Sequence, residues 1–274
     1  MIDGAIALAL LGALAFSAVT PLTASAYVAK ITNSVNTGAT ASYFSCSAAE
    51  AADKANAYFQ YYLNEASGAL TAVDSSNSVN TGTYRGSMTT STATPIACPR
   101  DSGGAYSLNG TTSYVSTSRI YTNPTSFSIE AWFKTTVAAG KLVGWGNART
   151  GASSSFDRHL YIETTGKLDF GTYSGATQVV TSPAAVNDGK WHHAVGTLSA
   201  STGMRLYLDG SLVASNASYT AAENDTGYWR VGYDSLSGWP NSGSGYFSGQ
   251  LRYAAAYSIV LSQTQVQNHF AAGR

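Results

Sequence analysis

Hydrophobic and polar side chains alternate most regularly over residues 190–215, KWHHAVGTLSASTGMRLYLDGSLVAS. Because successive side chains of a strand point to opposite faces, this alternation predicts two β-strands. The first strand places Trp191, His193, Val195 and Thr197 on one face and His192, Ala194, Gly196 and Leu198 on the other. Asp209-Gly210 follows the second strand and turns the chain into Leu212 and Val213. Both turn residues tolerate positive φ. The segment therefore predicts a hairpin closed by a two-residue turn.

Short runs of the same kind, separated by turn residues, recur along much of the chain. They lie at residues 58–64, 105–108, 113–116, 127–134, 141–145, 159–164, 167–173, 178–182, 228–233 and 246–257. In the run 127–134 apolar residues alternate with Ser128, Glu130, Trp132 and Lys134, which predicts a half-buried strand with one wet face. Short strands at regular spacing favour an antiparallel two-sheet sandwich over parallel βαβ units.

Several motifs in these strands resemble the laminin G-like domains of the concanavalin A-like jelly-roll superfamily. The family pattern DGxWHHVA…LYVDG is matched by Asp188, Gly189, Trp191, His192, His193, Tyr207, Asp209 and Gly210. The segments GGAYSLNGTTSYV, FSIEAWFKT and LSQTQVQNHFAAG extend the resemblance, and the last is similar to the family's short terminal helix. The resemblance implies a jelly-roll domain over residues 58–274.

A polar loop after the first predicted strand resembles an oxygen-rich loop of the same family. Asp74, Asn77 and Asn80 carry this likeness, although Asn77 stands where the family usually has glycine. Carboxylate, amide and backbone oxygens are the ligands that Ca²⁺ prefers, so one interpretation is a calcium site. The other interpretation is an Asx-turn loop without metal, and the sequence leaves both open.

Residues 1–29 form an apolar segment with two interpretations. As a secretory signal, the segment would be cleaved after Ala26 in the motif Ala-Ser-Ala, although its first residues lack Lys and Arg. As a retained anchor or filament-core helix, the segment would pack through a seam of small residues, as in pilin-like subunits. This seam comprises Ala5, Ala9, Gly12 and Ala13.

Residues 30–57 are expected to form a linker and a helical neck. The stretch AYVAKITNSVNTGATASYFSC is similar to a segment of actinobacterial exported surface proteins. Ser47 and Glu50 match a capping box that opens an Ala-rich helix extending to about Ala57. In an exported chain, the two cysteines, Cys46 and Cys98, are expected to form a disulfide.

Composition and motifs argue against several classes of function. The net charge is zero and only 11% of residues are charged, so nothing favours binding to nucleic acid. The paired acids of a jelly-roll glycosidase strand, E-x-D-x-x-E, do not occur in the sequence. His192 and His193 point to opposite strand faces and cannot jointly bind one metal ion, so we expect scaffold roles for both. The sequence therefore predicts a protein without catalytic residues.

A ligand site is expected on loops at one edge of the sandwich, where aromatic rings lie close to polar groups. The segment 228–241 has this mixture, and Trp239, beside Pro240, is the best candidate for an exposed ring. The predicted ligand-binding residues are Trp239, Asp234, Tyr233, Asn241 and Arg149.

These features predict a non-enzymatic extracellular or cell-surface protein. In the leading hypothesis, copies of the chain associate through the N-terminal helix into a pilin-like filament or anchored array. Its laminin G-like head would bind an extracellular glycan or a host or cell-surface ligand. The alternative is a freely secreted, lectin-like carbohydrate-binding module cleaved after Ala26. A hydrolase ranks last.

Overall fold

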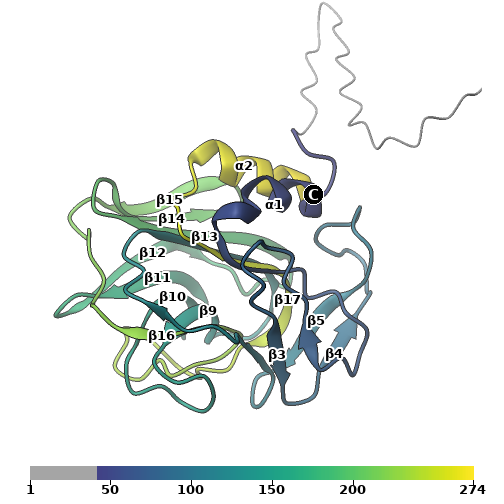
Figure 1. Cartoon of the computed structure of the whole chain (residues 1–274), viewed down its shortest axis with the longest axis horizontal. Coiled ribbons are helices and arrows are strands. Elements are labelled where there is room, and N and C mark those ends of the chain that lie inside the picture. The colour runs from purple at the N-terminus through teal and green to yellow at the C-terminus, as the bar shows by residue number, and fades with distance from the viewer. Residues whose placement is uncertain (1–41) are drawn as a thin grey trace, which may run out of the picture. The chain divides into compact units, whose positions relative to one another are not determined.

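The computed structural model describes residues 42–274, which fold into two packed antiparallel β-sheets (Figure 1). The predicted N-terminal helix, its small-residue seam and most of the predicted linker lie outside the described residues. Among residues 42–274, no helix is long and apolar enough to cross a membrane. The two-sheet sandwich predicted from the strand pattern is confirmed.

The first sheet contains eight strands and includes the predicted hairpin. Its order is β15 (Ser211–Asn216), β14 (Gly203–Leu208), β13 (Trp191–Ser199), β8 (Phe127–Lys134), β17 (Ser248–Tyr257), β5 (Ala105–Asn109) and β4 (Thr89–Ser91), with β1 (Ala57–Tyr61) also paired to β17. Asp209 and Gly210 join β14 to β15 with φ values of 50° and 77°. The two-residue turn that the Asp-Gly pair predicts is therefore confirmed.

The second sheet contains nine strands and packs face to face with the first. Its order is β12 (Thr177–Ala185), β11 (Lys167–Tyr173), β10 (Phe156–Ile162), β9 (Gly140–Gly146), β16 (Thr226–Val231), β6 (Tyr114–Ser116), β3 (Gly82–Arg85) and β2 (Thr71–Ala72), with β7 (Tyr121–Thr122) also paired to β16. The core lies between the sheets, where Phe133 and Leu251 of the first sheet join the same cluster as Leu142 and Phe170 of the second. At this interface Gly196 is required, because a Cβ there would lie 2.5 Å from the Phe170 ring.

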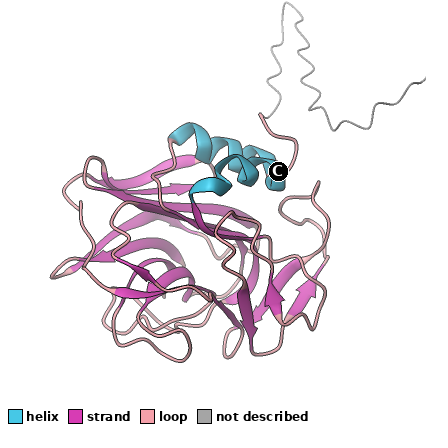
Figure 2. Cartoon of the chain, in the orientation of Figure 1, coloured by secondary structure: helices cyan, strands magenta, loops and turns pink. Residues whose placement is uncertain are grey.

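Two helices cover the outer face of the first sheet, as Figure 2 shows in cyan. They are α1 (Cys46–Asp53), continued by a 3₁₀ turn (Lys54–Asn56), and α2 (Gln263–Ala272). Glu130 and Trp132 point to this covered face and are buried. The predicted wet face of the strand 127–134 is therefore wrong, because alternation within one strand cannot show that distant helices cover it.

The structure also corrects the predicted start of the first helix. The N-cap of α1 is Ser45, whose side chain accepts a hydrogen bond from the Ala48 amide, so the capping box on Ser47 and Glu50 is wrong. The Glu50 side chain instead points inward and hydrogen-bonds the Tyr257 hydroxyl at 2.8 Å. The helix interpreted as a neck packs directly on the sandwich and belongs to the same compact unit.

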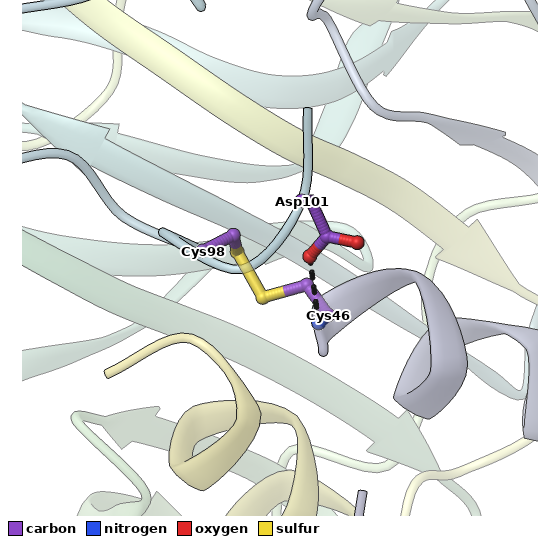
Figure 3. Close-up of side chains that lie close together, drawn as sticks. All are labelled: Cys46, Cys98 and Asp101. Carbon is purple, nitrogen blue, oxygen red and sulfur yellow. Dashed lines mark hydrogen bonds between the residues drawn. A yellow bond between two sulfur atoms is a disulfide. The ribbon is translucent and has the colours of Figure 1, made fainter. Parts of the chain in front are cut away.

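The predicted disulfide between Cys46 and Cys98 is confirmed and ties the start of α1 to the loop before β5 (Figure 3). The Asp101 carboxylate accepts a hydrogen bond from the Cys46 amide at 2.9 Å, as the dashed line in Figure 3 marks. An acidic side chain at a helix N-terminus accepts hydrogen bonds from the free amides there and interacts favourably with the helix dipole. The Arg252 guanidinium, from β17, donates to the carbonyls of Cys98 and Asp101 and holds the same loop on the sheet.

Candidate functional site

A cavity of about 380 Å³ lies on the outer side of the second sheet, opposite the helices of the first. Phe156 begins β10, Tyr173 ends β11 and Thr177 begins β12, so three neighbouring strands supply one wall. Loops supply the rest. The complete lining is Ser154, Ser155, Phe156, Tyr173, Thr177, Glu223, Ser237, Gly238 and Trp239.

The Trp239 ring lies flat against the sheet rather than standing free in solvent. Its centroid is 4.0 Å from that of the His159 ring, with the planes at 72°. A Cβ on Gly171 would lie 2.4 Å from the indole, so only glycine allows this approach. The side chain is 6% exposed, and the expectation of an exposed ring is therefore wrong. Trp239 nevertheless contributes to the cavity lining.

Hydrogen bonds from the second sheet fix the loop that carries Trp239. The Tyr161 hydroxyl donates to the Pro240 carbonyl at 3.0 Å, and the Thr164 amide donates to the Asn241 carbonyl at 2.9 Å. The Asn241 side-chain amide donates to the Glu163 carboxylate at 2.7 Å. Because these bonds anchor the two residues that follow Trp239, and the indole itself packs on the sheet, the indole position is set before any ligand arrives.

Glu223 is the acidic residue of the cavity, and hydrogen bonds of its backbone to other segments hold it in place. Its amide donates to the Tyr173 carbonyl at 2.6 Å, and its carbonyl accepts a hydrogen bond from the Arg158 guanidinium. The Ser155 hydroxyl lies 2.9 Å from the Glu223 carboxylate and 2.6 Å from that of Asp225. Glu223 is the one acid among the residues that line this cavity. The Asp225 carboxylate, which shares the Ser155 hydroxyl with Glu223, lies just outside the lining.

Charged groups are buried beneath the cavity floor. Burial lowers the pKa of Lys141 to about 8, and its ammonium lies 5.4 Å from the centroid of the Phe156 ring. Burial raises the pKa of Asp157 to about 6 against the opposing effect of Arg158, its ion-pair partner. His159 has its pKa lowered, first by burial and then by Lys141. These side chains are closed to solvent, so they affect the cavity only through packing and charge.

Of the five predicted ligand-binding residues, the structure places only Trp239 in the cavity. Asp234 is buried and accepts hydrogen bonds from the Ser153 amide and hydroxyl. Tyr233 stacks on Tyr246 with the ring centroids 3.6 Å apart.

The other two residues of that predicted set lie on the surface. Asn241 faces solvent apart from its bond to Glu163, and the Arg149 guanidinium donates to the Thr117 carbonyl at 3.1 Å. Four residues that line the cavity were not predicted as site residues from the sequence: Phe156, Tyr173, Thr177 and Glu223. Strand alternation places Tyr173 and Thr177 at adjacent strand ends, but nothing in the sequence shows that Glu223 folds back to them.

The polar loop at residues 74–80 is tied together by hydrogen bonds. The two Asp74 oxygens accept from the amides of Gln60, Ser76 and Asn80 and from the Ser76 hydroxyl. The buried Asn80 side chain accepts from the Ser118 and Arg119 amides, while Asn77 is exposed. The bond from the Ser76 amide forms the Asx-turn of the second interpretation. Calcium binding by Asp74, Asn77 and Asn80 stays a prediction.

A second cavity, of about 820 Å³, lies on the other side of the molecule beside α2. Its walls are mostly apolar and include Pro95, Trp132, Trp191 and Phe270. The first cavity combines rings with hydroxyls and an acid, which is the mixture that recognises polar ligands. We therefore take the cavity beside Trp239 as the candidate functional site.

Comparison with known proteins agrees with the fold. The model of the laminin G-like family described as the concanavalin A-like lectin/glucanases superfamily matches residues 109–267. Among curated proteins no match is found. Solved structures are similar in fold at low sequence identity.

The binding domain of Paraclostridial Mosquitocidal Protein 1 is 12% identical with a TM-score of 0.57, over 79% of this chain and 52% of that one. A structure of botulinum neurotoxin type C, whose cell entry depends on interaction with two ganglioside molecules, is 13% identical with a TM-score of 0.53, over 81% and 52%. Trypanosoma rangeli sialidase in complex with the inhibitor DANA is 12% identical with a TM-score of 0.50, over 77% and 32%.

The chain thus spans about half the length, or less, of these structural neighbours, and at such identities the likeness shows the fold alone. The family model, by contrast, covers more than half of the chain. The protein therefore belongs to the laminin G-like family of the concanavalin A-like lectin/glucanases superfamily.

Proposed function

We propose that the protein is a non-enzymatic binding module that holds a glycan in the cavity beside Trp239. The observation that carries this proposal is the lining itself, in which three aromatic side chains meet four hydroxyl side chains and one carboxylate. Sugar rings pack their C–H faces on aromatic rings, and their hydroxyls bond to hydroxyl and carboxylate oxygens. The single lining acid favours binding over hydrolysis, because most glycosidases use a pair of carboxylates.

The comparisons support a glycan ligand without naming it. The family description includes lectins, and the neurotoxin neighbour interacts with gangliosides, which carry glycans. A sialidase also contains this fold, over 32% of its chain, so the fold by itself does not favour binding over catalysis. The cavity of this chain is what favours binding.

A disulfide persists in oxidising surroundings, which supports an extracellular or cell-surface location. Display of the domain on a filament or anchor through residues 1–29, with copies of the chain as partners, is the arrangement we favour. Release as a secreted module is the alternative. Amino-terminal sequencing of the mature protein separates the two: a chain that starts at Tyr27 contradicts the filament.

Binding of the purified chain to a glycan array tests the function directly. We expect binding to at least one glycan, weakened tenfold or more by Tyr173→Ala and Glu223→Gln, since each removes a cavity contact. Phe44→Ala is the matched control, because this aromatic side chain is exposed and does not line the cavity. Loss of binding in the control as well as the cavity variants, or binding that both cavity variants leave unchanged, contradicts the proposal. Failure of the wild-type chain to bind any glycan also contradicts it.

A further inference from the structure

A second cluster of polar side chains lies between the two helices and the outer face of the first sheet. Glu50 comes from α1, His269 from α2 and Glu130 from β8, and the three side chains are 3%, 3% and 0% exposed. One ligand atom from each lies within 4.8 Å of the others. The site is far from the glycan cavity in the fold, since it lies on the opposite sheet.

We propose that this cluster binds a divalent transition-metal cation, of which Zn²⁺ is the representative, and that the cation fastens α1 and α2 to the sheet. Glu50 and Glu130 place two carboxyl groups in a site closed to solvent. Burying unneutralised carboxylates is costly, so such pairs are protonated or bound to a cation. One divalent cation neutralises both carboxylates.

The hydrogen bonds of His269 direct one ring nitrogen toward the carboxylates. Its Nε2 lies 3.2 Å from the Asp53 carboxylate, and its Nδ1 lies 3.0 and 3.1 Å from the two Glu130 oxygens. An Nε2–H bonded to Asp53 leaves the Nδ1 lone pair facing the cluster. A carboxylate behind a histidine is the usual support of a metal ligand, because it fixes the tautomer and the ring orientation.

An independent observation comes from His193 on β13. Its side chain is 0% exposed, neither ring nitrogen has a hydrogen-bond partner, and Nε2 lies 3.8 Å from a Glu130 oxygen. Buried polar atoms without partners are rare in folded proteins. A cation held by Glu130 would give this nitrogen a partner.

The ligand types select the class of cation. An imidazole with two carboxylates suits zinc and neighbouring transition metals, whereas Ca²⁺ and Mg²⁺ take oxygen ligands. Bonds of about 2.0–2.2 Å from zinc to nitrogen and oxygen place adjacent ligand atoms of a tetrahedral site about 3.3–3.6 Å apart. The separation of 3.0 Å between His269 Nδ1 and a Glu130 oxygen is slightly shorter than this spacing, and the separation of 3.8 Å between His193 Nε2 and a Glu130 oxygen is slightly longer.

The test uses the full chain, stripped of metal with a chelator and then titrated with ZnCl₂, with CaCl₂ as the comparison salt. We expect one equivalent of bound zinc by elemental analysis and a higher unfolding temperature, and calcium should not compete with zinc for the cluster. Co²⁺ in place of zinc should give visible absorption bands, which report the ligand set in the wild-type protein. Glu50→Gln and His269→Gln should abolish both signals.

Asp53→Asn should weaken zinc binding about 10–100-fold, as expected for a residue that supports a ligand. His192→Gln is the matched control, because this neighbouring imidazole bonds Asp188 and Asp209 at the surface and lies outside the cluster. The proposal is overturned if the stripped wild-type protein takes up no zinc and no Co²⁺ bands appear. It is also overturned if Glu50→Gln and His269→Gln bind zinc as tightly as the control, because the ion then lies elsewhere.

Discussion

At the scale of one residue, the second sheet contains a buried carboxyl group, that of Asp169, whose protonation changes with folding. Asp169 lies on β11 beside Tyr161, and one of its carboxylate oxygens has no hydrogen-bond partner. Burial raises its pKa to about 6, and the neighbouring Thr181 and Tyr161 hydroxyls oppose the rise only in part. The folded protein therefore holds this proton more tightly than the unfolded chain does.

This carboxyl should make the free energy of unfolding fall as pH rises. Below pH 3.8, its ordinary pKa, both states are protonated and the contribution is fully present; it is lost by about pH 6, where the folded state ionises. Between pH 4 and 7 the free energy of unfolding should decline less in Asp169→Asn than in the wild type, by about 1–2 kcal/mol. Chemical denaturation across this range measures the decline. A wild-type slope in Asp169→Asn contradicts the prediction.

The burial of Trp239 and the position of Glu223 in the candidate site could not be found by local pattern. Trp239 follows a glycine-rich stretch, which is typical of an exposed loop, but the absence of a side chain on Gly171 opens space beneath the indole. Glu223 lies in a loop whose return to Tyr173 depends on a backbone hydrogen bond between distant segments. The sequence indicated the region around Trp239, whereas the partners that complete the cavity come from long-range packing.

At the scale of elements, α1 depends on a covalent and an electrostatic restraint at its first turn. The disulfide joins Cys46 to Cys98 across 52 residues, and the Asp101 carboxylate bonds the Cys46 amide (Figure 3). A helix of eight residues is too short to be stable alone, so these contacts and its packing hold it in place.

Removing the disulfide should therefore destabilise the whole domain. For the double variant Cys46→Ser/Cys98→Ser we expect a free energy of unfolding lower by about 2–5 kcal/mol, mainly because the unfolded chain gains freedom. Urea denaturation with and without a reducing agent measures the effect. The reductant should lower the stability of the wild type toward that of the variant and leave the variant unchanged. Equal stability of the oxidised wild type and the variant would refute the role of the bond.

The strands were the most predictable elements, and their surroundings the least. The strands at 127–134 and 167–173 have the bounds that alternation predicts, because each repeats its pattern over several residues. The short strands β2, β3, β4 and β7 were missed, since they contain two to four residues. The wet face predicted for 127–134 failed because the cover is supplied by α1 and α2, from the two ends of the described chain.

At the scale of the described domain, the two sheets have outer faces of different character. The helices, the disulfide and the Glu50, Glu130 and His269 cluster lie over the first sheet, beside the apolar cavity that Trp191 and Phe270 line. The second sheet is covered by loops, and the glycan cavity opens among them beside Trp239. This division places the rigid restraints on one side and the proposed binding surface on the other.

The central claim is that the cavity beside Trp239 is the place where a glycan binds. The most direct measurement is a crystal structure of the chain with the glycan that binds best on the array. We predict a sugar ring packed against Tyr173 and Trp239, with a hydroxyl bonded to the Glu223 carboxylate. A sugar bound elsewhere, for example in the apolar cavity beside Trp191 and Phe270, would contradict the claim.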